Sequence, residues 1–182
     1  MANPYRKSTK LPEGSTQRFP LLPRLISTSL GAGFLPVCPG TWGALVGIIL
    51  WLPLYLWATA PVCVWSTIAA SVIFCIAGVW SSSEAEKYWG QDPVVACIDE
   101  TVGQWIALIP VAGVALCPWW EILVAFALFR FFDIFKPLGI RVTERLPKGY
   151  GMMADDVVAG IYSAIIILCI NYLFVFPAHE IA

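Results

Sequence analysis

The chain has 182 residues, a size typical of one domain, and it is 59% hydrophobic and only 13% charged, with a mean hydropathy of +0.76. So few polar residues cannot cover the surface of a water-soluble domain of this size, and the composition therefore predicts a membrane protein. The net charge of −1 and the absence of a long Lys/Arg block argue against a nucleic-acid partner, because such binding depends on clustered positive charge.

The N-terminal region differs from the rest of the chain. Residues 1–24 are polar, Pro-rich and basic rather than a short charged head leading into an apolar stretch, so they do not resemble a cleaved signal peptide. We expect residues 1–30 to form a cytoplasmic tail followed by an amphipathic segment at the membrane interface. Residues 31–177 then form one membrane-embedded domain, and residues 178–182 form a C-terminal tail.

A Gly-rich segment, residues 31–43, leads into the first apolar stretch. Its backbone N–H groups and the hydroxyl of Thr41 are candidates for binding a phosphate at the start of a helix. An entry loop with only a structural role is an equally good interpretation.

Five apolar stretches predict an all-α, polytopic membrane bundle of about five helices. The first two, 41–60 and 61–80, are each about 20 residues long, enough to cross a hydrocarbon core, and a tight turn joins them. The next two, 102–118 and 119–135, are shorter, so half-spans or a re-entrant pair are an alternative. The fifth stretch is 157–176.

With five spans, all 11 Lys and Arg residues fall on one side of the membrane. The positive-inside rule assigns that side to the cytoplasm. All of the 12 acidic residues except Glu121 and Glu180 lie on the same side. The scarce charges are therefore concentrated at one boundary of the bilayer.

Carboxylates from three helices are expected at that boundary. Unpaired carboxylates at the edge of a bilayer are costly, so a cluster of them predicts a functional site. Two occur before the third span, one ends the fourth, and two are expected to begin the fifth: Asp99, Glu100, Asp133, Asp155 and Asp156.

Purely structural roles, in helix capping or ion pairing, are the alternative to this interpretation. Asp99 and Asp155 precede apolar helices, where aspartate often caps backbone N–H groups. Asp133 lies in a last helical turn, where its charge opposes the helix dipole, and the alternative for it is an ion pair with Arg130. Capping therefore explains two of these residues and not the third.

The spacing of the acidic pairs favours convergence. Glu100 and Gln104 share a helical face, as do Asp156 and Gly160, and a small residue follows each acidic pair by one turn. Small residues let helices approach closely. Hard oxygen ligands from several helices suit Mg²⁺, so all five carboxylates are candidate metal ligands.

Cationic side chains surround the same boundary and are candidates for binding an anionic head group. Simple surface charge is the alternative, and Arg130 and Lys136, which flank Asp133, are the better candidates. The candidate substrate-binding set is Thr41, Gln104, Arg130, Lys136, Arg145 and Lys148.

Four motifs, in this order along the chain, resemble the phosphatidylglycerophosphatase A family: 39–43 (PGTWG), 98–105 (IDETVGQW), 129–137 (FRFFDIFKP) and 149–160 (GYGMMADDVVAG). The resemblance covers about residues 31–164. It implies a Mg²⁺-dependent phosphatase of the bacterial inner membrane, which removes the terminal phosphate of phosphatidylglycerophosphate to give phosphatidylglycerol.

The resemblance also suggests roles for the residues. Asp99, Glu100, Asp133 and Asp156 are the expected catalytic carboxylates, with water as the direct attacking group. A phosphatidyl-group transferase is the nearest rival, but it would carry an Asp-x-x-Asp-Gly-x-x-Ala-Arg pattern that this chain lacks. A transporter or scaffold would not require acids gathered from three helices. The expected partners are a lipid phosphate and the membrane, and the oligomeric state is left open.

Overall fold

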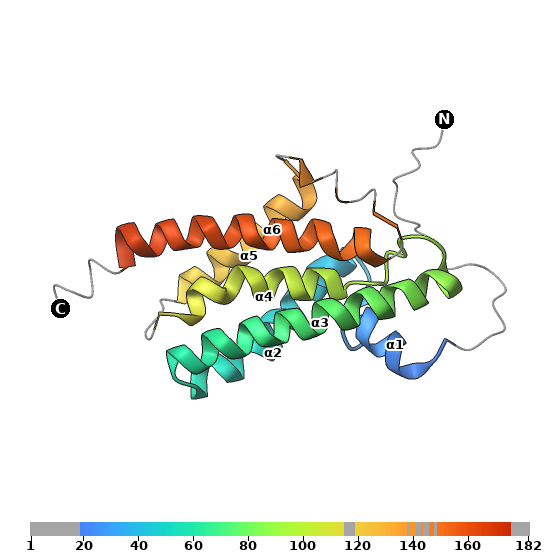
Figure 1. Cartoon of the computed structure of the whole chain (residues 1–182), viewed down its shortest axis with the longest axis horizontal. Helices are drawn as coiled ribbons and strands as arrows, with labels where there is room; N and C mark the ends of the chain where they lie inside the picture. The colour runs from blue at the N-terminus through green and yellow to red at the C-terminus, as the bar shows by residue number, and fades with distance from the viewer. Residues whose placement is uncertain are drawn as a thin grey trace.

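The computed structural model is all-α across the residues that it describes, as predicted. These are residues 19–114, 119–137, 139–140, 143, 146–147 and 149–175, with side chains described as far as 173. In chain order (Figure 1) the elements are α1 (Leu21–Ser27), the 3₁₀ helix η1 (Ala32–Phe34), α2 (Pro39–Trp57), α3 (Ala60–Trp89), α4 (Ile98–Ala112), α5 (Trp119–Phe135), α6 (Gly149–Ile170) and the π-helical η3 (Asn171–Val175).

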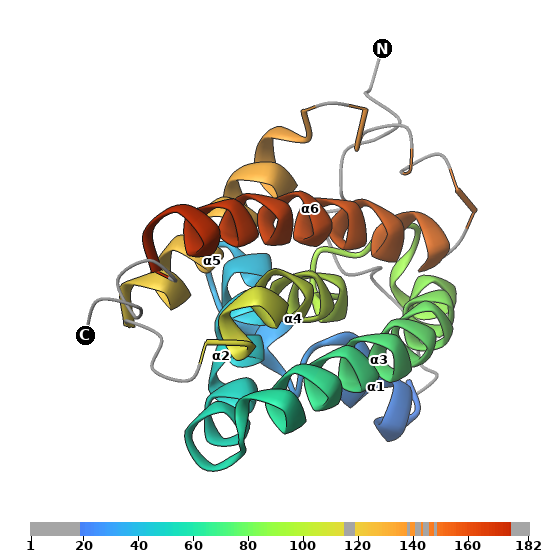
Figure 2. The same cartoon turned by 60° about the vertical axis from the view of Figure 1, so that its left-hand side comes forward.

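Helix α4 is the centre of the bundle. It packs against α2, α3, α5 and α6, and Figure 2 shows these four helices arranged around it. Of its 15 residues, all but Ile106 and Ile109 are buried. Because protein rather than lipid surrounds α4, it does not need the roughly 20 residues that a lipid-exposed span requires.

Three helical segments of the described chain are long and apolar enough to cross a membrane. These are α2, α3, and α6 continued into η3 as far as Leu173. The two remaining apolar helices, α4 and α5, correspond to the short third and fourth predicted spans. The two-residue connection between Trp57 and Ala60 confirms the predicted tight turn.

The predicted start of the last helix was wrong. We expected Asp155 and Asp156 to begin it, but α6 already begins at Gly149. A Cβ atom at Gly149 would lie 2.6 Å from the carbonyl oxygen of Val79, and the Gly149 N–H donates to the Ser83 hydroxyl at 3.2 Å. This packing against α3 outweighs the low helix propensity of glycine, so both aspartates lie in the second turn.

Two glycines bring α4 and α6 together, which confirms the prediction made from the small residues. A Cβ atom at Gly103 would lie 2.7 Å from the carbonyl oxygen of Asp156, and one at Gly160 would lie 2.5 Å from that of Gly103. The two backbones are therefore almost in contact. This crossing places the acidic turn of α6 beside the acidic turn of α4.

The N-terminal segment is amphipathic, as expected. Leu21 and Leu22 of α1 are 68% and 63% exposed, whereas Pro23 and Ser27 are buried where α1 packs against α3. The carbonyl of Ser27 accepts a hydrogen bond from the N–H of Cys97, at 2.8 Å. The segment is thus attached to the start of α4.

Candidate carboxylate site

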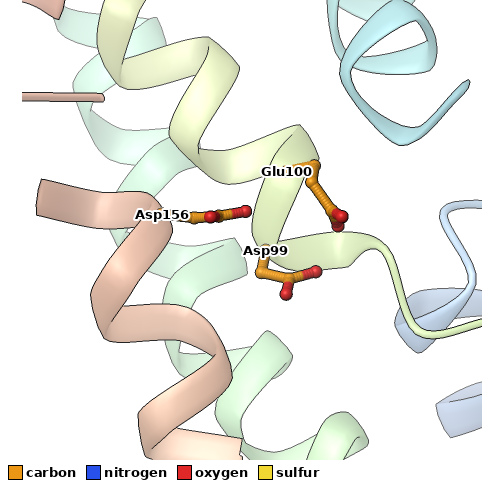
Figure 3. A group of neighbouring side chains, drawn as sticks. All are labelled: Asp99, Glu100 and Asp156. Carbon is orange, nitrogen blue, oxygen red and sulfur yellow. The ribbon is translucent and has the colours of Figure 1, made fainter. Parts of the chain in front are cut away.

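Three buried carboxylates converge where α4 and α6 begin. Asp99 and Glu100 lie in the first turn of α4, and Asp156 comes from α6. One ligand oxygen from each lies within 4.8 Å of the other two. Figure 3 shows Asp156 extending toward α4, where Asp99 and Glu100 project to the same side. The predicted convergence of acids from separate helices is therefore present.

The local structure explains why these carboxylates are tolerated on α4. Asp99 and Glu100 occupy the first helical turn, where negative charge complements the helix dipole. The cap residue, Cys97, makes no side-chain hydrogen bond to the helix end. The dipole offsets only part of the cost of burying two charges.

The other two candidate carboxylates pair with cations. Asp133 forms an ion pair with Arg130 at 2.5 Å, as the alternative interpretation anticipated, and both side chains are largely buried. Asp155 pairs with Lys136. The negative charges of Asp133 and Asp155 both act on Asp156, so all five carboxylates belong to one electrostatic unit.

Lys136 joins α5 to α6. It follows the last residue of α5 with a φ of 47°, and its N–H donates to the carbonyl of Phe132 at 2.9 Å. A left-handed conformation is unfavourable for lysine. The ion pair with Asp155 gives a reason for a lysine, rather than a glycine, at this helix end.

The start of α2 lies directly against the site. A Cβ atom at Gly40 would overlap Oε1 of Glu100 and lie 3.2 Å from Nη1 of Arg130. Gly40 therefore leaves room for both the carboxylate and the guanidinium beside the backbone of α2. Thr41, a predicted substrate-binding residue, follows Gly40 in the same turn and is partly exposed.

Replacing Gly40 with alanine is expected to lower kcat by about tenfold to a hundredfold, because the new methyl group displaces the Glu100 carboxylate. Stability should change little, since the displaced atoms are the end of a flexible side chain. Gly113→Ala is the matched control, because its nearest new contact is an ordinary 3.4 Å. Steady-state kinetics and thermal unfolding measure both effects. Unchanged kcat in Gly40→Ala would contradict this role.

Gln104 has an unusual environment. Its side chain is 0% exposed, and neither its amide nitrogen nor its amide oxygen has a hydrogen-bond partner among the described residues. It lies one turn after Glu100 on the same helical face. An unpartnered buried amide costs about 1–3 kcal/mol, which favours a role in binding over one in packing.

Two candidate substrate-binding residues, Arg145 and Lys148, lie outside the described residues. Two other residues that reasoning from the sequence overlooked lie at the site's edge. Thr101 directly follows Glu100 and is buried, and Ser29 contacts it from the N-terminal segment. The position of Thr101 beside an acidic pair was a weak signal, whereas nothing in the sequence singled out Ser29.

The donor set fits a divalent cation. Three buried carboxylates lie together, and the nearby Arg130 and Lys136 are each paired with a further acid. One oxygen of Asp156, Oδ2, is buried without a hydrogen-bond partner among the described residues. Buried carboxylate oxygens gathered at one point are the hard ligands that Mg²⁺ prefers.

Comparison with known proteins gives a consistent result. The family model of phosphatidylglycerophosphatase A matches residues 25–171. Proteins named phosphatidylglycerophosphatase A from Haemophilus influenzae and Escherichia coli are 36% and 34% identical, covering 81% of this chain in both cases and 88% and 83% of their own lengths. A relative from Bacteroides thetaiotaomicron, named putative phosphatidylinositol-3-phosphatase, is 47% identical over 80% of this chain and 91% of its own length. No solved structure matches.

Proposed function

Because this chain belongs to the phosphatidylglycerophosphatase A family and is a lipid phosphatase, we propose that it hydrolyses the terminal phosphate of phosphatidylglycerophosphate to give phosphatidylglycerol. We also propose that the reaction depends on Mg²⁺ and takes place at the cytoplasmic face of a bacterial inner membrane. The observation that carries this proposal is the buried group of Asp99, Glu100 and Asp156 with its neighbouring cations.

Asp99, Glu100 and Asp156 would hold the Mg²⁺. When bound, the ion would draw charge from the phosphoryl oxygens and make a bound water more acidic. The carboxylates contribute by their burial, because a site shielded from bulk water strengthens every charge interaction within it.

The cations and the buried amide would hold the phosphoryl group. Nε of Arg130 is buried and donates no hydrogen bond within the described chain, so it is available for a phosphoryl oxygen. Lys136, which pairs with Asp155, adds a second positive charge beside Asp156. Gln104, one turn after Glu100, offers both a donor and an acceptor to the head group.

Asp133 is the carboxylate that we assign as the proton acceptor. It lies outside the group of three and its side chain keeps 12% exposure, so water can reach it. Arg130 orients it through their ion pair. In this scheme the attacking water gives its proton to Asp133 as the new P–O bond forms, and the leaving alkoxide of the lipid takes a proton from solvent.

The distribution of charge supports a cytoplasmic site. Lys87 lies in the last turn of α3, and Arg130 and Lys136 lie at the end of α5. Both ends contact the first turns of α6, where the Gly149 N–H donates to Ser83 of α3 and Lys136 pairs with Asp155, and α4 is the helix that follows α3. The positive-inside rule then assigns the site to the cytoplasmic side.

A second substrate is favoured by one specific observation. The 47% identical relative is named a putative phosphatidylinositol-3-phosphatase, so a phosphorylated inositol lipid is the alternative substrate. Both candidates are lipid phosphomonoesters, and both suit a phosphate site at the membrane boundary.

Phosphate release from three lipids distinguishes the candidates. Purified full-length protein in mixed micelles with Mg²⁺ is expected to show its highest kcat/KM with phosphatidylglycerophosphate, compared with phosphatidylinositol 3-phosphate and phosphatidic acid. Release mainly from the inositol lipid would replace the first substrate with the second. Release from none of the three would contradict the proposed function.

A further inference from the structure

The turn after α1 has a strained backbone. Ser29, Leu30 and Gly31 all have positive φ values, of 47°, 62° and 98°. Only glycine adopts this conformation freely, and a serine and a leucine in succession are costly. Such strain persists only where surrounding contacts hold it, and Ser29 is buried.

The contacts that hold Ser29 come from the start of α4. Its hydroxyl lies 3.0 Å from the carbonyl of Cys97 and 2.7 Å from the hydroxyl of Thr101, and its single proton is shared between these two acceptors. The Thr101 hydroxyl in turn donates to the carbonyl of Gly43 at 2.8 Å. Two buried hydroxyl groups therefore connect the strained turn, α2 and α4.

This network lies next to the catalytic carboxylates. Cys97 caps the turn of α4 that carries Asp99 and Glu100, and Thr101 follows Glu100 directly. Gly43 is on the same helix as Gly40, which contacts Glu100 and Arg130. The network therefore sets both the rotation of the first turn of α4 and its separation from α2.

We propose that Ser29 and Thr101 are positioning residues, whose paired hydroxyls hold the first turn of α4 so that Asp99 and Glu100 meet Asp156. The inference rests on the proposed function, because it gives these hydroxyls a role in the same hydrolysis. A shift of about 1 Å in a catalytic group lowers a rate by about a hundredfold. Loss of the network should therefore reduce turnover far more than it reduces stability.

The bundle offers a close control. Thr67 is also buried, donates to the carbonyl of Cys63 at 2.7 Å and accepts from Nε1 of Trp51 at 2.9 Å, between α2 and α3. Thr101→Val and Thr67→Val remove the same hydroxyl from similar networks without changing side-chain shape. Both variants should lower the unfolding temperature by a similar amount.

The test compares kcat, KM and unfolding temperature in purified full-length protein, with the lipid phosphate that the unmodified protein hydrolyses best. Thr101→Val should lower kcat about tenfold to a hundredfold with little change in KM, while Thr67→Val keeps normal kcat. Thr101→Ser, which retains the hydroxyl, should restore most of the loss. Ser29→Ala should behave like Thr101→Val, with Ser71→Ala as its control, since Ser71 is buried and donates to the carbonyl of Thr67.

Equal kcat values in Thr101→Val and Thr67→Val, or no recovery in Thr101→Ser, would overturn the inference while leaving the proposed function standing. Absence of hydrolysis by the unmodified protein would instead refute the proposed function. In that case, Mn²⁺ binding measured by electron paramagnetic resonance tests whether Ser29 and Thr101 position the carboxylates. Binding weakened about tenfold only in the Ser29 and Thr101 variants supports it, and equal or absent binding overturns it.

Discussion

Asp156→Asn is expected to lower kcat by about 10³-fold in a protein that remains folded. Asparagine has the shape of aspartate but lacks its charge, and Asp156 is the contribution of α6 to the buried group of three. In metal-free protein the unfolding temperature should rise, because one of several repelling buried charges is removed. Phosphate release and thermal unfolding in the presence of chelator measure the two effects.

The matched control for this variant is Glu84→Gln. Glu84 pairs with Lys87 on α3, on a part of that helix open to solvent, so neutralising it should alter neither turnover nor stability appreciably. Near-normal turnover in Asp156→Asn would contradict the assignment of the site. A fall in the metal-free unfolding temperature would contradict the idea that these carboxylates repel one another.

Chelation of divalent cations should abolish phosphate release and lower the unfolding temperature of the unmodified protein. A ligand present at a hundredfold excess over its Kd stabilises the folded state by about 2.7 kcal/mol, and its removal takes that stabilisation away. The buried carboxylates of Asp99, Glu100 and Asp156 then lie close together without the ion between them. Titration with Mg²⁺ after treatment with chelator, followed by activity and by thermal unfolding, tests both parts.

Asp156→Asn also serves as the control for the chelation experiment. Its unfolding temperature should respond much less to chelator and to Mg²⁺, because one of the three proposed ligands is lost. Full activity of the unmodified protein in excess chelator would contradict the Mg²⁺ requirement. If Mg²⁺ restored activity without changing the unfolding temperature, the reaction would still require Mg²⁺, but the proposed binding site would be contradicted.

Hydropathy was sufficient to locate the helices approximately, but their ends depended on packing. The apolar stretch 61–80 marked the lipid-facing part of α3, and the helix continues to Trp89 through a polar segment. Buried Ser81, Ser82 and Ala85 in that segment face neighbouring helices instead of lipid. The start of α6 at Gly149 was likewise decided by contact with α3, which local propensity does not report.

For the acidic residues too, the sequence predicted the approximate location and the packing decided the partners. Their positions relative to the apolar stretches predicted that carboxylates from three helices meet at one boundary, which agrees with the charge of Asp133 and Asp155 acting on Asp156. Asp133 is the acid nearest to Lys136 along the chain. Spacing therefore did not predict that Lys136, at the end of α5, pairs with Asp155 of α6. That pairing depends on how the chain turns after α5.

The sequence by itself determined the class of protein, the approximate helices, the boundary where the charges gather and the family resemblance, because hydropathy and motif spacing are properties of the chain alone. Only the tertiary structure decided which acids form the buried group, since that depends on the crossing of α4 and α6 at Gly103 and Gly160. It also decided that Ser29 reaches Thr101, because a contact between segments so distant in the chain exists only once the helices have packed.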